Sequence, residues 1–149
     1  MPIKITPEIA ETINNALATK TPVVIAYADE RGQPILSFRG SVQVSGEDEV
    51  TWWVRNAEGM MAKTIAAHPR VALMYRNPET RISFQLQGHG RVVGNGAERD
   101  RIYDASPKPE QDADPNRKGV GIAVKLDRIE GLAGFGPDGP IRIKMTREG

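Results

Sequence analysis

The sequence of 149 residues has no cysteine and only two histidines, His68 and His89. The lack of cysteine excludes disulfides, thiolate metal sites and a thiol nucleophile. The two histidines are far apart in the sequence and neither has a carboxylate cluster beside it, so we expect no metal site. The sequence shows no catalytic triad either, and it leaves the catalytic residues unknown.

The chain also lacks a charge excess and a long apolar run. Its 20 lysines and arginines nearly balance its 19 aspartates and glutamates, giving a net charge of +1. An oligonucleotide-binding barrel would need a basic groove that this balance does not provide, so we expect no nucleic-acid partner and only local anion sites. The runs VVIAYA and VALMY are far shorter than the roughly 20 residues of a membrane span. The first residues do not resemble a signal peptide, and the expected location is cytoplasmic, away from membranes.

What is present is a pattern of short strands with a few helices, in one domain over residues 1–149. Thr6-Pro7-Glu8 is typical of a helix start, and four apolar residues follow on one face: Ile9, Ile13, Ala16 and Leu17. Further helices are expected at 60–68, ended by Pro69, and at 95–105. Alternating or β-branched segments predict strands at 23–28, 35–44, 50–55, 71–76, 81–93, 119–132 and 141–145.

These elements predict a mainly β (α+β) fold, a six- to seven-stranded antiparallel barrel with short flanking helices. Gly88 and Gly90 indicate a bulge or bend in the long strand 81–93. The glycine-rich pieces GHGRVVG and GFGPDG do not join a strand to a helix, which argues against a Rossmann dinucleotide site. The charged, proline-containing segment 104–119 is expected to be a mobile loop or a lid.

Three cations stand where a barrel does not require them. Arg39 lies in the strand 35–44, Arg55 ends the next strand, and Lys63 lies in the first turn of the helix 60–68, where it opposes the helix dipole. If those two strands pair, the three side chains can converge with free helix N–H groups on an anion of phosphate size. The alternative is that all three extend into solvent.

Two further features leave alternatives open. Trp52 and Trp53 are adjacent in a strand and therefore face opposite ways. One belongs in the core, and the other is free to flank a flat ligand or a subunit interface. His89 lies between two glycines and is either a bend residue or a residue of unassigned role.

The order of these elements resembles a known family. The strand and turn VVIAYADERGQPILSF, the ending WWVRN, a helix with a lysine, the join HPRVALMY and the strand QGHGRVVG follow one another as in the pyridoxamine 5'-phosphate oxidase-like superfamily. This superfamily comprises split β-barrel flavin-binding proteins and includes deazaflavin-dependent reductases. The most specific part is the motif formed by Lys63, Pro69, Arg70, Val71, Ala72 and Leu73.

The resemblance implies a homodimer with the flavin at the subunit interface. It implies that the cofactor is held by Arg39, Trp53, Val54, Met61, Ala62 and Lys63, and that Arg81 and Ser83 approach the ring from the partner subunit. Arg55 joins these candidates from its place at the end of the strand. Met61 and Ala62 would contribute through their backbone. They stand where the family often has a hydroxyl residue and a second cation, so either the phosphate shell is thinner here or Arg55 substitutes.

The resemblance further implies an oxidoreductase that transfers a hydride between FMN and a small planar substrate, with the deazaflavin coenzyme F420 as the alternative cofactor. The C-terminal Trp and Arg motif of true pyridoxamine phosphate oxidases is missing from IRIKMTREG, which argues against that activity. A non-catalytic carrier or sensor of flavin or haem on the same barrel is the alternative function.

Overall fold

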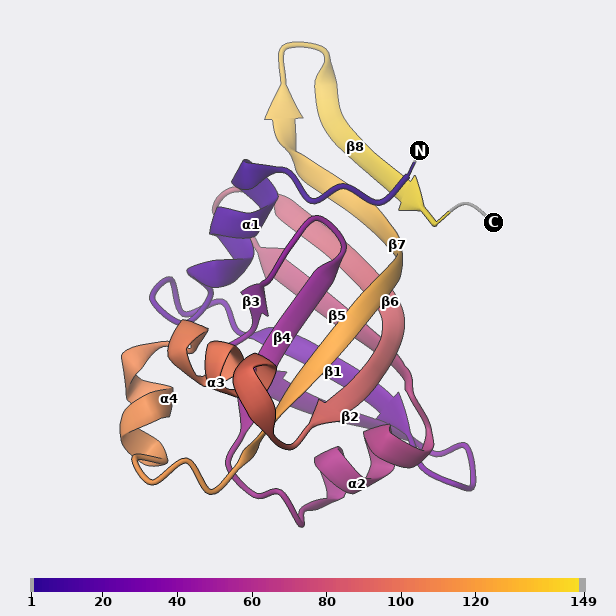
Figure 1. Ribbon diagram of the computed structural model, residues 1–149. Helices are drawn as coiled ribbons and strands as arrows, with labels where there is room; N and C mark the ends of the chain where they lie inside the picture. The colour runs from indigo at the N-terminus through magenta and orange to yellow at the C-terminus, as the bar shows by residue number, and fades with distance from the viewer. Residues whose placement is uncertain (1, 148–149) are drawn as a thin grey trace.

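The computed structural model describes residues 2–147 and contains eight strands and four short helices within that range. The strands form one antiparallel sheet in the order β2-β1-β5-β6-β7-β4-β3, and β8 pairs with β7 (Figure 1). The first and last strands of this order are not paired with each other, so the sheet curls into a barrel that stays open. This confirms the predicted antiparallel split barrel with short flanking helices.

The elements agree closely with the sequence pattern. The helices are α1 (Pro7–Asn14), α2 (Met60–Ala67), α3 (Gly96–Ala105) and α4 (Lys108–Ala113). The strands are β1 (Val23–Ala28), β2 (Pro34–Arg39), β3 (Gln43–Val44), β4 (Glu49–Val54), β5 (Arg70–Asn77), β6 (Ile82–Val93), β7 (Val120–Gly136) and β8 (Gly139–Thr146).

Helix α1 begins as its sequence predicts. The Oγ1 of Thr6 accepts a hydrogen bond from the N–H of Ile9 at 3.3 Å, a cap contributing about 1 kcal/mol. Ile9 and Ile13 are buried against the barrel, as is Ala16. Leu17 is exposed, because the helix ends at Asn14 and the chain after it no longer follows the helical face.

The predicted strand 35–44 is two strands with different partners. β2 pairs with β1, and β3 pairs with β4, with a corner at Gly40 and Ser41 between them. A Cβ on Gly40 would lie 2.8 Å from a methyl carbon of Leu17, so the corner is a place of close approach. The strand count is therefore eight rather than six or seven.

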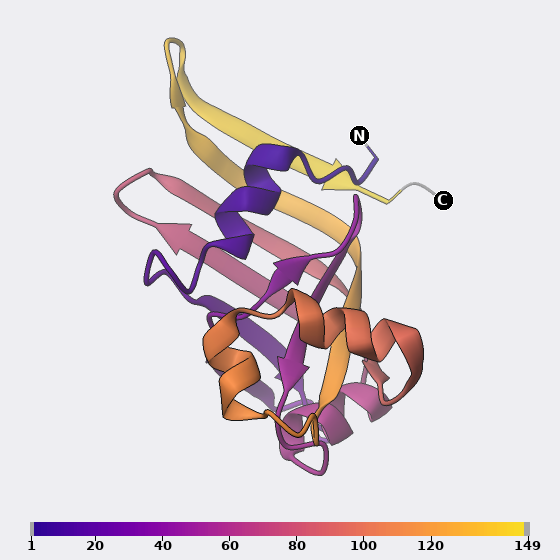
Figure 2. The same cartoon turned by 60° about the vertical axis from the view of Figure 1, so that its left-hand side comes forward.

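The interior of the barrel holds the main core, with Trp52, Phe84 and Leu86 among its large buried residues. Helix α2 covers one end of the barrel, and its residue Ile65 is fully buried there. Helices α3 and α4 lie beside β4 (Figure 2), where Trp53, Val93, Ile102, Tyr103 and Ala123 form a second, smaller core.

The segment 104–119, predicted as a loop, contains the end of α3 and all of α4. This expectation is wrong in secondary structure, because polar contacts rather than apolar residues attach the segment to the sheet. Asp114 is buried, and its carboxylate accepts hydrogen bonds from Trp53 Nε1 at 2.9 Å and from the N–H of Gly119 at 2.9 Å. The carbonyl of Asp114 also accepts the hydroxyl of Tyr103 at 3.0 Å.

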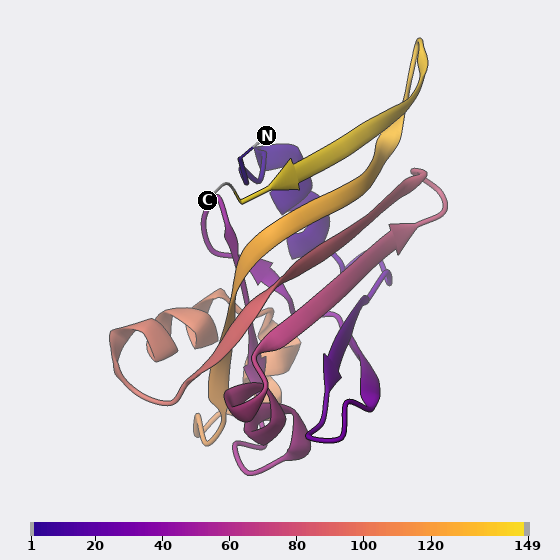
Figure 3. The ribbon, with the colours of Figure 1, turned by 90° about the vertical axis from the view of Figure 1, so that its right-hand side faces the viewer.

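Strands β5, β6 and β7 run side by side as the long central strands of the sheet (Figure 3). The pairing of β6 with β7 shifts register between Gln87 and Gly88, which confirms the predicted irregularity near the glycines. At Gly88 a Cβ would lie 2.1 Å from the carbonyl oxygen of Lys125, so no side chain fits there.

None of the helices within residues 2–147 is long and apolar enough to span a bilayer.

Candidate functional site

A hollow of about 360 Å³ lies where β2, β4 and the start of α2 meet. It is lined by Arg39, Val54, Arg55, Asn56, Gly59, Met60 and Met61. The N-terminus of α2 has no side-chain cap and no acidic residue in its first turn. Since the first N–H groups of a helix have no partner within the helix, this end attracts an anion.

Arg39 is the most constrained cation of the hollow. Its Nε atom is buried and has no hydrogen-bond partner in the described structure, and its Nη2 lies 3.8 Å from the Sδ of Met61. Burial lowers the pKa of the Arg39 guanidinium, while the carboxylate of Glu110 acts in the opposite direction. A buried donor without an acceptor costs free energy, so this group is poised to bind an anion.

Arg55 lies in the same hollow and contacts helix α4. Its Nε is 3.4 Å from Oε1 of Glu110, a largely buried carboxylate. The same Oε1 is without a well-formed hydrogen bond. Sequence reasoning missed Glu110, because it lies in the segment predicted as a loop, and nothing in its spacing indicates that it faces two arginines.

Lys63 does not line the hollow. Its ammonium is exposed and lies 3.2 Å from Oε2 of Glu58, in the turn that precedes α2. The structure therefore brings Arg39 and Arg55 together as predicted, but in this arrangement it leaves the third cation outside. The premise that the two predicted strands pair holds for β3 with β4 and not for β2, whose partner is β1.

The burial of Trp53 differs most from what the sequence predicted. Both tryptophans are fully buried: Trp52 lies in the barrel, with its Nε1 3.3 Å from the Sδ of Met61, and Trp53 lies under α3. The expectation that one tryptophan side chain would be free to flank a ligand or an interface is wrong. The side chains of Val54 and Ala62 are buried as well, so only backbone groups of Trp53, Val54 and Ala62 are available to a ligand.

Ser83 lies near the start of β6, and Arg81 directly precedes that strand. The start of β6 is at the opposite end of the strand from α2 (Figure 3). Arg81 has a positive φ of 58°, and its guanidinium lies over the ring of Phe135 at 5.0 Å. In one chain these residues do not meet Arg39 or Arg55. Any shared site requires a second subunit.

The outer face of the sheet carries an apolar surface. Phe38 and Leu36 on β2 are 73% and 70% exposed. The strand register places Phe38 beside Val24 and Val24 beside Met74 on β5, which is also exposed. Exposed aromatic and aliphatic side chains in register over three strands are typical of a surface that another protein covers.

No group of three or more metal-ligating side chains occurs in the part of the chain that the structure describes. Two arginine side chains line the hollow, and their positive charge suits an anion rather than a metal cation. The open antiparallel barrel defines a split-barrel protein. The arginines at the uncapped start of its covering helix form a candidate anion site.

Comparisons with known proteins agree with this architecture. The family described as pyridoxamine 5'-phosphate oxidase matches residues 6–130, and the chain belongs to that family. No curated protein sequence matches it.

Several solved structures share the fold. HupZ of Group A Streptococcus is 24% identical with a TM-score of 0.67, and the match covers 87% of this chain and 96% of that one. A Lactobacillus delbrueckii protein assigned to the pyridoxamine 5'-phosphate oxidases is 16% identical with a TM-score of 0.63, covering 85% and 93%. A protein named F420 reductase is 19% identical with a TM-score of 0.61, covering 83% and 98%.

Proposed function

We propose that this protein is a homodimeric, flavin-dependent oxidoreductase that transfers a hydride between its cofactor and a small planar substrate. FMN is the proposed cofactor, and the deazaflavin coenzyme F420 is the alternative, in keeping with the F420 reductase among the similar folds. The cofactor would supply the redox chemistry, while the protein binds and orients it. The observation that carries the proposal is the pair of arginines at the uncapped end of α2.

The residues of the hollow fit a phosphate group. Arg39 offers a buried Nε that has no partner in the described structure, and Arg55 offers a second guanidinium. The start of α2 adds backbone N–H groups near Met61 and Ala62. Lys63 is held only by an exposed pair with Glu58, and such surface pairs contribute about 0–1 kcal/mol, so its ammonium can turn to a bound phosphate at little cost.

Glu110 opposes an anion in the hollow. Its largely buried carboxylate already faces Arg55 and raises the pKa of Arg39 against the effect of burial. A phosphate would compete with this carboxylate for the same guanidinium groups. Flavin binding is therefore expected to separate Glu110 from the arginines.

The apolar outer face supports the homodimer. Leu36 and Phe38 expose large apolar side chains that a second copy of the chain would cover. The start of β6, where Ser83 lies and which Arg81 precedes, is far from the hollow of its own chain. The copies of these two residues on a partner subunit are therefore the ones proposed to approach the cofactor.

The proposal is tested by native mass spectrometry of freshly purified protein, followed by flavin titration of variants. A dimer carrying FMN or F420 is expected. Arg39→Ala and Lys63→Ala should each weaken FMN binding by about 1–3 kcal/mol, because each removes a charge-assisted contact. Glu110→Gln should strengthen binding, and Arg31→Ala, an exposed turn residue, is the matched control.

Unchanged affinity in both Arg39→Ala and Lys63→Ala would remove the anion site from the proposal. Bleaching of the bound flavin by a reduced nicotinamide supports an enzyme. A Soret band in place of a flavin spectrum would instead assign the protein to the haem carriers or sensors.

A further inference from the structure

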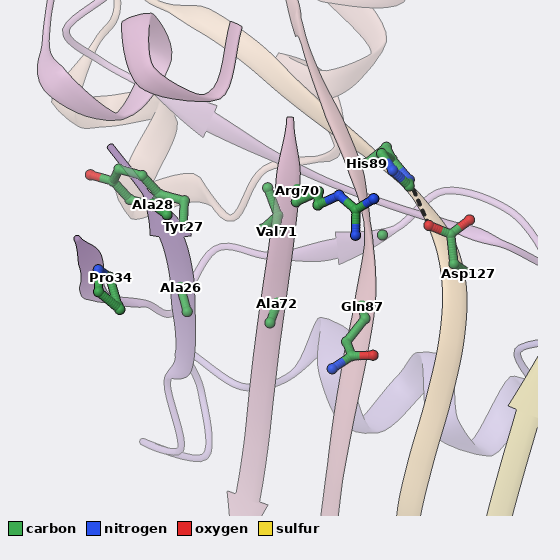
Figure 4. A pocket seen from close by; sticks show the side chains of 11 residues that line it. Ala26, Tyr27, Ala28, Pro34, Arg70, Val71, Ala72, Gln87, His89 and Asp127 are labelled. Atoms are coloured by element: carbon green, nitrogen blue, oxygen red, sulfur yellow. Dashed lines mark ion pairs between the residues drawn. The ribbon is translucent and has the colours of Figure 1, made fainter. Parts of the chain in front are cut away.

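A second pocket, of about 450 Å³, lies on the outer face of the sheet across β1, β5, β6 and β7 (Figure 4). Pockets of this size accommodate small organic molecules. Small residues form much of its lining: Ala26, Ala28, Ala72 and Gly88. Because these residues project little or no side chain, a flat ring can lie directly against the strands.

The polar side of this pocket is created by the bulge between β6 and β7. Gln87 pairs with Arg128 and Gly88 pairs with Leu126, so Asp127 is the extra residue that has no partner on β6. Lys125, Asp127 and Arg128 are all accessible, whereas Leu126 is fully buried. Bulges often re-aim a side chain next to a functional site, and here the bulge turns a carboxylate to the outer face.

Asp127 holds the imidazole of His89. The distance from His89 Nδ1 to Asp127 Oδ2 is 2.6 Å, and both side chains are partly exposed (Figure 4). A carboxylate this close favours the neutral tautomer with the proton on Nδ1 and the lone pair on Nε2. Nε2 has no hydrogen-bond partner within residues 2–147, so the ring is oriented and still has one nitrogen free to contact a ligand.

Arg70 supplies the cation of this pocket. It is the direct cross-strand neighbour of His89, and its side chain extends toward β6 (Figure 4). Side chains at such positions have Cβ atoms about 5 Å apart, so both can contact one small molecule. Within the described residues Arg70 makes no ion pair, and its side chain makes no hydrogen bond. Another arginine on this surface does have a partner: Nε of Arg147 lies 3.5 Å from Oδ1 of Asp127.

We propose that this pocket binds a small planar molecule with a carboxylate group. Arg70 pairs with the carboxylate, the ring lies on the alanines of β1 and β5, and Nε2 of His89 accepts a hydrogen bond from a ring substituent. Asp127 is the positioning residue that fixes the imidazole. Identifying this ligand with the substrate rests on the proposed oxidoreductase function, whereas the binding site rests on the geometry of the pocket. The pocket borders the apolar surface proposed as the dimer face, because Ala26 pairs with Leu36.

The test is a titration of cofactor-free protein with benzoate and 2-naphthoate, observed through the ring nitrogens of the histidines by NMR. Since the chain has only two histidines, the signals of His89 are assigned by His89→Gln. The free protein should show His89 protonated on Nδ1. The acids should shift the ring signals of His89 and leave those of His68 unchanged.

Variants separate the roles of the two charged residues. Arg70→Ala should weaken 2-naphthoate binding by about tenfold or more, the effect of losing one charge-assisted contact. Arg76→Ala is the matched control, because Arg76 is exposed on the same face of β5 and does not line the pocket. Asp127→Asn should redistribute the proton between the two ring nitrogens of His89 and lower the affinity, while the backbone amide spectrum stays that of the folded protein.

Three outcomes would overturn the inference. The first is that neither acid moves the signals of His89. The second is that neutral 2-naphthamide binds as tightly as 2-naphthoate, which removes the role of the cation. The third is equal binding by the Arg70→Ala and Arg76→Ala variants. Loss of flavin binding in the hollow does not affect this test, because the titration uses no cofactor.

Discussion

Replacing Asp114 by alanine should detach the α3–α4 segment from the sheet and destabilise the protein by about 3 kcal/mol. The carboxylate of Asp114 accepts three hydrogen bonds: from Trp53 Nε1 at 2.9 Å, and from the N–H groups of Gly119 at 2.9 Å and Lys118 at 3.0 Å. Bonds to charged groups contribute about 1.5–3 kcal/mol each, and leaving a buried donor unpaired costs about 1–3 kcal/mol.

The three contributions do not add fully. The N–H of Lys118 is partly accessible and can bind water when the carboxylate is removed. The donors of Trp53 and Gly119 are buried and would lose their partner. Burial of the carboxylate itself also costs free energy, which its removal recovers. A net loss of about 3 kcal/mol is at the upper end of ordinary single substitutions.

The assay is urea unfolding followed by tryptophan fluorescence, because one of the two tryptophans is a partner of the altered residue. Asp112→Ala is the matched control: its carboxylate is exposed and, among residues 2–147, pairs only with Lys108, four residues away at 3.2 Å. The control should lose no more than about 0.5 kcal/mol. A loss below about 1 kcal/mol for Asp114→Ala would refute the claim that this carboxylate holds the segment.

Three more predictions concern acid, the bulge and the outer face. Burial alone would raise the pKa of Asp114, but its hydrogen-bond donors hold that pKa below its usual range. The stabilisation by this carboxylate is therefore present at neutral pH and is lost as pH falls below about 4. The difference in urea midpoint between wild type and Asp114→Asn should accordingly shrink from about pH 7 to about pH 3. Gly88→Ala should cost about 2 kcal/mol or more in urea unfolding because its methyl group would overlap a backbone carbonyl, whereas Gly94→Ala, with nothing nearby, should cost far less. Leu36→Lys with Phe38→Lys should convert the proposed dimer to a monomer in sedimentation, and an unchanged dimer would exclude this face as the interface.

Most of the fold could be predicted because its strands are half-buried and alternate in hydrophobicity. The break at Gly40 was missed, since the alternation of Leu36, Phe38, Val42 and Val44 continues across the corner. A periodic pattern shows that two faces differ. It does not show where a chain changes its partner strand.

The candidate site was harder to predict than the fold. Arg39 and Arg55 could be proposed from their places in strands, but the burial of Trp53 depends on α3 and α4, whose sequence is too polar to indicate a packing element. The pairing of His89 with Asp127 depends on a one-residue register shift, and sequence spacing carries no information about which residue a bulge leaves without a partner.

The position of β7 also determines the order in which the chain can assemble. Residues 121–125 of this strand pair with β4 on one side and with β6 on the other. Before they emerge from the ribosome, the nascent chain can form only two separate pieces, the four strands β2-β1-β5-β6 and the hairpin of β3 and β4, each with an unpaired edge. Joining them is a late, long-range step, so we expect refolding to be limited by the docking of β7 and aggregation to compete until that strand is in place.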